Sequence, residues 1–484
     1  MKATQFLCIL ASLALLSSCG SGSDIPLTQQ SEPETSQTEP TTDPPAPAME
    51  YPDYDGQTVT IMANSTPWLN KDFVYDPEQA GSAFNDAVYK RNTMVEEQLN
   101  VKIEIVEAER IAIHKNMAAH VLAGDASIDV YTPQLYTVPS LIEQGCVHNL
   151  IQIPELHIDE NWWSQNFLKN FRTDKAVWCL VGDIMSSIKD LNICTVFNGR
   201  LIDEAGYENI YEIAADGKWT LDKMYEICST LSRDLNGDSV MDEHDQYGYT
   251  HTVSGLALTF MNCADGYLTG LDENGDFTFL EENVERAHAA IEKISKIYGD
   301  PSIMAEISKL PDTWTSATNM FKNGQVAMRS ANIYNIMKMR DMVEDFGILP
   351  MPKYDDTQEN YKSQVLGNML DTITISACSE KVDAAGSVLD ALAYYSADTT
   401  VKAYYDITLE GIVTRDKESL EMLDIIFEGE FFEFIEIFRF GGMYDSLGVT
   451  VADPGKFMST LETRKAALLA DMKKTGGLFS GAES

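Results

Sequence analysis

Positively charged residues are scarce in this chain of 484 residues. Lysine and arginine total 35 against 75 aspartates and glutamates, which gives a formal net charge of −40 at pH 7. A chain so acidic repels nucleic acid phosphates and anionic lipid headgroups, and no local basic patch offsets this charge. Nucleic acid is therefore not an expected partner, and neutral or cationic ligands suit the charge better. For most of the carboxylates, keeping the protein soluble is a sufficient role.

The apolar run near the N-terminus is too short to span a bilayer. It extends from Ala3 to Leu16, roughly 14 residues, whereas a transmembrane helix needs roughly 20. A basic start at Met1-Lys2, this run and the small residues after it predict a secretory signal peptide over residues 1–18. Leu16-Ser17-Ser18-Cys19 resembles the bacterial lipobox, which implies a lipid on Cys19 that anchors the protein to the extracellular face of the cell membrane. The alternative is an ordinary signal peptide with a chance cysteine.

Apolar residues are nearly missing from residues 19–54. This stretch is rich in serine, threonine, proline and glutamate, so it has little surface to bury in return for the entropy that ordering would cost. We expect a disordered linker that holds the folded part away from the membrane.

A cysteine framework is also missing. Cys8 lies in the leader and Cys19 is the lipidation candidate, and the other six cysteines are scattered without CxxC or zinc-type spacing. We interpret them as small hydrophobic core residues, although one disulfide remains possible.

Common catalytic motifs are absent as well. The sequence contains no GxSxG, HExxH, Walker or GxGxxG motif, and its seven histidines show no ligand spacing. An adhesion or interaction protein would be expected to contain internal repeats, and the sequence shows none. A surface glycoside hydrolase, which needs only two suitably spaced carboxylates, stays open as an alternative to a binding protein.

The first part of the folded region alternates strands and helices. Period-two or β-branched runs predict strands at Thr58–Met62, Val101–Ile105 and Ile128–Tyr131, and apolar residues at helical spacing predict helices over Phe84–Leu99 and Ile111–Ala123. This βαβαβ order predicts a mostly parallel sheet with helices on both faces. Ligands of such sheets bind outside the carboxyl ends of the strands, which points to the loops 64–68 and 132–136.

Several ordered segments carry a resemblance to a known family. They are Leu141-Ile142-Glu143-Gln144-Gly145, Val196-Phe197-Asn198, Lys218-Trp219-Thr220-Leu221, Phe321–Met328, Gly347–Pro352 and Ile375–Ser379. Together with the preceding pattern, they resemble family 1 extracellular solute-binding proteins of ABC importers, the maltose-binding type. The resemblance implies an α/β fold of the periplasmic-binding-protein-like type II class, with two lobes joined by hinge strands and a cleft between them. It also implies reversible sugar binding and delivery to a permease, without catalysis.

The resemblance sets expected lobe boundaries. The first lobe would comprise 55–190 with about 322–372, and the second 191–321 with about 373–484, including C-terminal helices. A peptide-binding receptor of the same importer class differs only in its cleft chemistry and stays open.

Candidate ligand-binding residues combine aromatic rings, which stack on sugars, with hydrogen-bonding groups. The strand-end loops supply Trp68, Gln134 and Tyr136. By resemblance, the segment approaching the hinge, the loop after Met328 and the C-terminal helices add Lys189, Asp190, Asn332, Tyr334, Arg439 and Phe440.

The segment 234–245 predicts a structural calcium site. Its oxygens follow the EF-hand order, with side chains at loop positions 1, 3, 5, 9 and 12 and a carbonyl at position 7. The expected ligands are Asp234, Asn236, Asp238, Val240, Asp242 and Asp245. Ser239 in place of the usual glycine and Asp245 in place of the bidentate glutamate depart from the pattern, and a polar turn without metal is the alternative.

Overall fold

The computed structural model describes residues 49–480, except residues 67, 68, 70, 208, 252–255, 274, 306–312, 340, 341 and 414–417. The predicted signal peptide, Cys19, nearly all of the linker and Trp68 lie outside the described residues. The compact part of the described chain begins at Tyr51, so the predicted linker boundary at residue 54 is wrong by a few residues. The reason is that Tyr51 donates a hydrogen bond to Asp390 (3.0 Å) and the Tyr54 hydroxyl lies 2.8 Å from that of Ser387.

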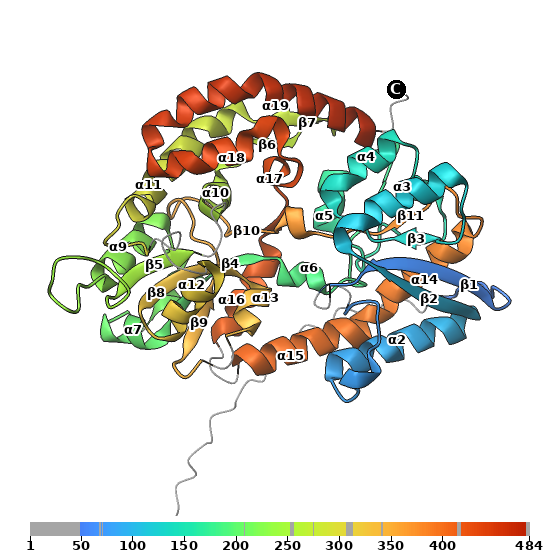
Figure 1. The fold of residues 1–484 in the computed structure, drawn as a ribbon, viewed down its shortest axis with the longest axis horizontal. Coiled ribbons are helices and arrows are strands. Elements are labelled where there is room, and N and C mark those ends of the chain that lie inside the picture. Colours follow the sequence, from blue (N-terminus) through green and yellow to red (C-terminus); the bar gives the residue numbers. More distant parts are fainter. Residues whose placement is uncertain are drawn as a thin grey trace, which may run out of the picture. The chain divides into compact units, whose positions relative to one another are not determined.

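The first lobe is built on a four-stranded sheet with strand order β11-β3-β1-β2. β1 (Gln57–Asn64) pairs in parallel with β2 (Val101–Ala108) and β3 (Val130–Tyr131), and β11 (Thr374–Ile375) pairs antiparallel with β3. The helices of this lobe are α2 (Ala83–Leu99), α3 (Ile113–Ala123), α4 (Val138–Glu143), α5 (Gln165–Phe171), α6 (Ser187–Asp190) and α14 (Val382–Ser396). α2 and α14 pack together on one face of the sheet, and α3 lies on the other (Figure 1).

The alternation predicted for residues 58–131 is confirmed. The residues of α2 that recur at four-residue spacing, from Phe84 to Leu99, are buried. The helix ends where Asn100 adopts φ 48°, and α3 ends where Gly124 adopts φ 66°, both in the left-handed region that closes helices. Local sequence therefore determines the start and end of these elements.

The second lobe has its own four-stranded sheet, with order β5-β8-β4-β9. β4 (Ile193–Asn198) is central and pairs antiparallel with β8 (Val326–Asn332) and β9 (Phe346–Leu349), while β5 (Tyr247–His251) runs parallel to β8. A separate antiparallel hairpin joins β6 (Thr269–Leu271) and β7 (Phe277–Phe279). The helices are α7 (Gly199–Glu204), α8 (Ile210–Ala215), α9 (Leu221–Leu231), α10 (Leu256–Met261), α11 (Val284–Tyr298), α12 (Thr313–Lys322) and α13 (Ile333–Met337).

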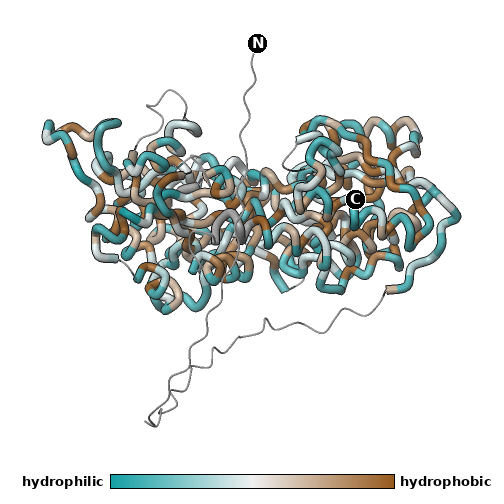
Figure 2. The backbone as a smooth tube through the Cα atoms, turned by 90° about the horizontal axis from the view of Figure 1, so that it is seen from below, coloured by the Kyte–Doolittle hydropathy of each residue, from teal (hydrophilic) through white to brown (hydrophobic). Residues whose placement is uncertain are grey.

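The remaining elements connect or cover the lobes. β10 (Ser363–Gln364) pairs with β12 (Glu430–Phe431), and the C-terminal helices are α15 (Lys402–Val413), α16 (Glu418–Glu428), α17 (Phe434–Phe438), α18 (Met443–Gly448) and α19 (Phe457–Phe479). α15 contacts both α2 and α13, so it runs between the lobes (Figure 1). In both lobes hydrophobic and hydrophilic residues alternate along the elements (Figure 2), as expected where one face meets a core.

The chain crosses between the lobes at two neighbouring segments. Leu366 N–H donates to the carbonyl of Leu191 (3.2 Å), and the Ser363 hydroxyl donates to the carbonyl of Ile193 (2.9 Å). The segment before β4 therefore lies beside the segment around β10, and α15 forms a third connection. Within the described residues, no helix combines the length and apolar character needed to cross a membrane.

The predicted lobe boundaries after residue 321 are wrong. The segment 322–372 was expected in the first lobe, yet β8 and β9 pair with β4 of the second sheet. Residues after 372 were expected in the second lobe, yet β11 pairs with β3 and α14 packs on α2 of the first. The resemblance rests on the order of short segments along the chain, and that order does not specify the long-range partner of each strand or helix, which explains the error.

Candidate functional site

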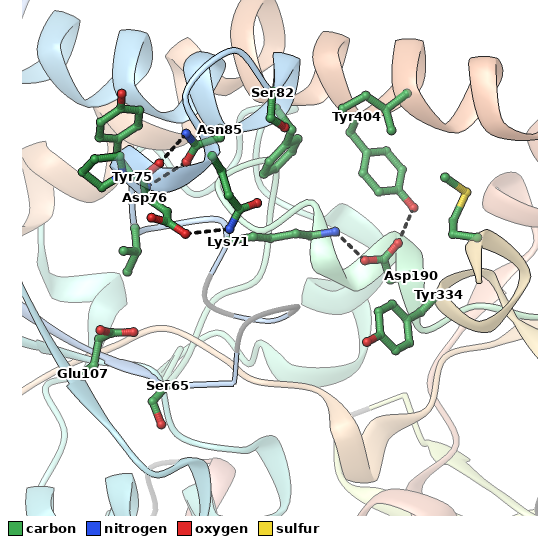
Figure 3. Close-up of a pocket in the computed structure, with 16 residues that line it drawn as sticks. Ser65, Lys71, Tyr75, Asp76, Ser82, Asn85, Glu107, Asp190, Tyr334 and Tyr404 are labelled. Atoms are coloured by element: carbon green, nitrogen blue, oxygen red, sulfur yellow. Dashed lines mark hydrogen bonds and ion pairs between the residues drawn. The ribbon is translucent and has the colours of Figure 1, made fainter. Parts of the chain in front are cut away.

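A cavity of about 650 Å³ lies at the carboxyl ends of strands from both lobes. Ser65 follows β1, Glu107 lies near the end of β2, and Tyr334 is on α13 directly after β8. The other lining residues come from the segment before α2, from α2 itself and from α6, α13 and α15 (Figure 3): Lys71, Val74, Tyr75, Asp76, Pro77, Gln79, Ser82, Phe84, Asn85, Asp190, Met337, Tyr404 and Ile407. A ligand in this cavity would contact both lobes.

A charged network forms one wall of the cavity. Lys71 Nζ lies 2.6 Å from Asp190 Oδ2, and the Tyr404 hydroxyl donates to Asp190 Oδ1 at 2.8 Å (Figure 3). The Lys71 ammonium also lies 5.4 Å and 5.3 Å from the ring centroids of Phe84 and Tyr404. Burial raises the pKa of Asp190, and the contacts with Lys71 and Tyr404 offset part of that rise. Both carboxylate oxygens are thus committed to protein partners, which suits positioning better than proton transfer.

The loop before α2 has a fixed shape. Asp76 N–H donates to Asn85 Oδ1 and Asn85 Nδ2 donates to the Asp76 carbonyl, each at 2.9 Å. The Asp76 carboxylate in turn accepts from the backbone of Glu78 (2.9 Å) and the side chain of Gln79 (2.8 Å). These contacts hold the aromatic ring of Tyr75 and several polar side chains at the cavity rim.

A second layer of buried groups holds α6 in place. Asp72 accepts from Ser186 N–H (3.0 Å), from the Ser186 hydroxyl (2.5 Å) and from Ser187 N–H (3.1 Å). The fully buried Arg91 donates to the Asp72 carbonyl and to the Ser396 hydroxyl. Burial lowers the pKa of Arg91 to about 10, and Asp72 opposes this shift. The position of Asp190 therefore depends on residues of the segment before α2, of α2 itself and of α14.

Another ion pair lies at the ends of the same strands but does not line the cavity. Arg110 Nε is 2.9 Å from Asp371 Oδ1, and Asn64 Nδ2 also donates to Asp371. Burial raises the pKa of Asp371 to about 6, and Arg110 and Asn64 partly offset it. This pair ties the ends of β1 and β2 to the segment that crosses between the lobes.

The predicted site residues divide into several groups. Asp190 and Tyr334 line the cavity, whereas Gln134 and Tyr136 contact each other elsewhere (3.3 Å). Lys189, Asn332 and Arg439 are not part of the lining of this cavity. Lys189 lines a second cavity, and Asn332 caps α13 by accepting a hydrogen bond from Asn335 N–H. The Arg439 guanidinium lies 3.8 Å from the Tyr444 ring centroid. Phe440 is buried among Phe277 and Phe438, so the structure does not leave it open to a ligand.

Sequence reasoning missed most of the cavity lining. Lys71, Tyr75, Asp76 and Asn85 follow the predicted strand-end loop directly, so extending that loop to the start of α2 would have found them. Tyr404 gives no such signal, because it lies 214 residues after Asp190 and only the fold brings the two together.

The predicted calcium loop forms a network of turns. Asp234 accepts from Gly237 N–H (2.6 Å) and Ser239 N–H (2.8 Å), and Asp245 accepts from the backbone of Leu235 (2.8 Å) and Asp242 (2.9 Å). Ser239 has φ 67°, the conformation that glycine usually supplies at this EF-hand position. Across the described ranges, no three His, Cys, Asp or Glu side chains converge to hold a metal. The expected ligands Asp234 and Asp245 hold the loop through backbone hydrogen bonds, and calcium stays a prediction.

Comparisons with known proteins agree with this geometry. A family model described as "Bacterial extracellular solute-binding protein" matches residues 90–416, more than half of the chain. No curated protein sequence is significantly similar to this one.

Solved structures share the fold. The maltose-binding periplasmic protein MalE from Listeria monocytogenes, in complex with maltose, is similar with a TM-score of 0.59 at 14% identity, over 87% of this chain and 99% of that one. An extracellular solute-binding protein from Staphylococcus aureus in complex with maltose gives 0.58 at 14%, over 86% and 98%. The cyclic alpha-maltosyl-1,6-maltose binding protein from Arthrobacter globiformis gives 0.60 at 12%, over 86% and 99%. The predicted two-lobed α/β fold of the type II class is confirmed.

Proposed function

The chain belongs to the bacterial extracellular solute-binding protein family, and from this premise we propose that the cavity between its lobes captures a neutral sugar or oligosaccharide. The observation that carries the proposal is a single cavity, lined from both lobes, that combines Tyr75, Phe84 and Tyr334 with neutral hydrogen-bonding side chains. Sugars offer apolar ring faces and hydroxyl edges, which such a lining can stack on and hydrogen-bond. The maltose bound to two proteins of similar fold supports the same ligand class.

Ligand binding would favour approach of the two lobes. A solute that contacts Lys71 and Asp76 on one side and Tyr334 on the other gains its full set of contacts only when both walls are close. The crossings at Leu191–Ile193 and Ser363–Leu366 are the segments about which the lobes would move. The closed form, with the solute bound between the lobes, would then deliver it to the permease of an ABC importer.

Lipidation of Cys19 would keep the receptor at the membrane, with residues 20–50 as its tether. An acyl chain contributes about 0.8 kcal/mol for each buried methylene, so two or more chains anchor a protein stably. Labelling cells with an alkynyl fatty acid tests this: the wild-type chain should carry label, and Cys19→Ala should not. Equal labelling of both chains would remove the anchor from the proposal.

The binding proposal is tested by titration calorimetry of the mature chain with maltose, maltotriose, maltotetraose and a set of peptides. We expect saturable heats with sugars, a higher melting temperature, and recovery of the sugar intact by chromatography. Small-angle scattering should show a smaller radius of gyration with the bound sugar. Release of shorter sugars would favour the hydrolase instead, and binding of peptides alone would change the ligand class.

Calcium binding by residues 234–245 is a separate proposal that the EF-hand order of oxygens supports. Binding would require the side chains of Asp234, Asp238 and Asp242, which now accept backbone hydrogen bonds, to turn toward a common ion. Titration with calcium should give saturable heat that Asp234→Ala abolishes. Identical heats in both proteins would reject the site.

A further inference from the structure

A second cavity, of about 290 Å³, lies beside the crossing between the lobes. Two of its walls are the segment 161–166 and the segment 182–189, which ends in α6. The others are Val401, directly before α15, Phe427 of α16 and Glu430 of β12. Lys189 lines this cavity, while its neighbour Asp190 lines the larger one. The two cavities therefore share α6 as a wall but have no lining residue in common.

Three charged side chains line the second cavity: Asp183, Lys189 and Glu430. Within the part of the chain that the structure describes, none of the three forms an ion pair with another side chain. The Lys189 ammonium lies over the rings of Phe427 and Tyr405, 4.8 Å and 5.5 Å from their centroids. Glu430 accepts one hydrogen bond, from Asn192 Nδ2 at 3.0 Å, through one of its two oxygens. The Asp183 carboxylate has no hydrogen-bond partner among the described side chains.

Unpaired charges in a partly buried site are costly, because the protein replaces only part of their hydration. Burial raises the pKa of Asp183 to about 6, and Lys189 only partly offsets the rise. Burial also raises the pKa of Glu430, and the hydrogen bond from Asn192 and the positive charge of Lys189 offset part of that rise. Other buried carboxylates among the described residues are either paired with a cation, as Asp190 and Asp371 are, or accept several hydrogen bonds, as Asp72 and Glu436 do, whereas the Asp183 carboxylate has neither. The second cavity is an exception that a bound counter-charge would explain.

We propose that this second cavity binds a small zwitterion, of the class of free α-amino acids, with its ammonium at Asp183 and Glu430 and its carboxylate at Lys189. The lining carries two negative groups and one positive group, so it complements a molecule that has both charges. A cavity less than half the volume of the main one suits a small molecule. The ring of Phe427 and the apolar atoms of Met185 and Ile188 remain to contact a short side chain.

Two other ligand classes fit less well. A metal ion would be repelled by the Lys189 ammonium, and among the described residues no three metal-ligating side chains converge here. A simple anion would face two carboxylates for one lysine. This site does not depend on the proposed sugar binding, because it uses different residues and could be occupied whether or not the main cavity is.

The test is titration calorimetry of the full mature chain with glycine, L-alanine, L-serine and L-glutamine, and with ethylamine and acetate as probes that carry one charge each. We expect saturable binding of at least one amino acid, at least tenfold tighter than ethylamine or acetate. Lys189→Met and Asp183→Asn should each weaken that binding at least tenfold. The matched controls Lys175→Met and Asp174→Asn change exposed residues outside this cavity and should leave it unchanged.

The outcomes separate cleanly. Folding of each variant is checked by its melting temperature, and Glu430→Gln provides a third, nearly isosteric change in the same cavity. Absence of saturable binding by every amino acid would overturn the proposal, as would binding that all three cavity variants retain. Equal binding of acetate or ethylamine would overturn the zwitterion class. A Tyr334→Ala variant, altered only in the main cavity, should bind the amino acid as the wild type does.

Discussion

The two cavities on either side of α6 differ in whether their lysine forms an ion pair with a carboxylate of the protein. In the larger one the single lysine of the described lining is bound to Asp190, which also accepts from Tyr404. In the smaller one Lys189, Asp183 and Glu430 face a shared space without an ion pair among the described residues. Charges that the protein satisfies internally leave a surface suited to neutral ligands, whereas charges left without partners favour a charged ligand. The difference can be tested by removing one charge from each cavity.

The largest effect is expected from Asp190→Ala. Lys71 and Tyr404 would lose the acceptor that they share in a site where Asp190 is only 4% exposed. We expect the free energy of unfolding, measured by urea at pH 7, to fall by about 2–3 kcal/mol. Asp445→Ala removes an exposed partner of Arg439 and should change it by less than about 0.5 kcal/mol. Similar losses in both variants would show that the Asp190 network is not satisfied internally as we describe.

Asp183→Asn should raise the free energy of unfolding at pH 7, whereas Asp190→Ala lowers it. Burial raises the pKa of Asp183 to about 6, above the value of about 3.9 expected in the unfolded chain. The native carboxyl holds its proton more tightly, so its contribution to stability is present below pH about 4 and is lost as pH rises to about 6. Asparagine does not titrate, so at pH 7 we expect the variant to be about 1–2 kcal/mol more stable than the wild type.

This gain should fade between pH about 6 and about 4, where the wild-type carboxyl becomes protonated. Urea unfolding at pH 4, 5, 6 and 7 measures it, with Asp174→Asn as the control for an exposed carboxylate. Lys189 and Glu430 are the charged groups that share the cavity, and they are unchanged in this variant. Parallel pH profiles for wild type and Asp183→Asn would show that Asp183 is not held at a cost.

How much of the structure the sequence could predict depends on whether a feature is set by local residues or by contacts between distant ones. β1, α2, β2 and α3 follow from local periodicity, and Asn100 ends α2 because it tolerates the left-handed conformation. The partners of β8, β9 and β11 depend on where the chain crosses between lobes, and no local pattern specifies that. Resemblance pointed to Asp190 and Tyr334, but not to Lys71 or Tyr404, which reach the cavity through the folding of distant segments.

A third test compares two predicted ligand residues that the structure separates. Tyr334 lines the main cavity, whereas Tyr136 is 43% exposed and outside it. If a maltooligosaccharide binds in the main cavity, Tyr334→Ala should weaken the binding about three- to tenfold through the lost ring contact. Tyr136→Ala should change it less than about twofold. Calorimetry that ranks the two variants in the reverse order would move the sugar site to the loop after β3.

The smallest expected effect concerns the charge of the solute. The described lining of the main cavity carries the carboxylates of Asp76, Glu107 and Asp190 against the one ammonium of Lys71. Maltitol and maltobionate have similar size, but only the second carries a negative charge. We expect maltobionate to bind about two- to fivefold more weakly at low salt, because partly hydrated charges at cavity distances interact by about 1 kcal/mol or less.

The same physical argument predicts how that difference responds to conditions. Salt should reduce it, since screening at about 1 M ionic strength confines charge interactions to about 3 Å. Glu107→Gln should also reduce it, because the substitution removes one negative charge from the wall while keeping the shape of the side chain. Equal or tighter binding of maltobionate by the wild type would mean that the Lys71 ammonium is available to ligands despite Asp190, and the contrast between the two cavities would then not hold.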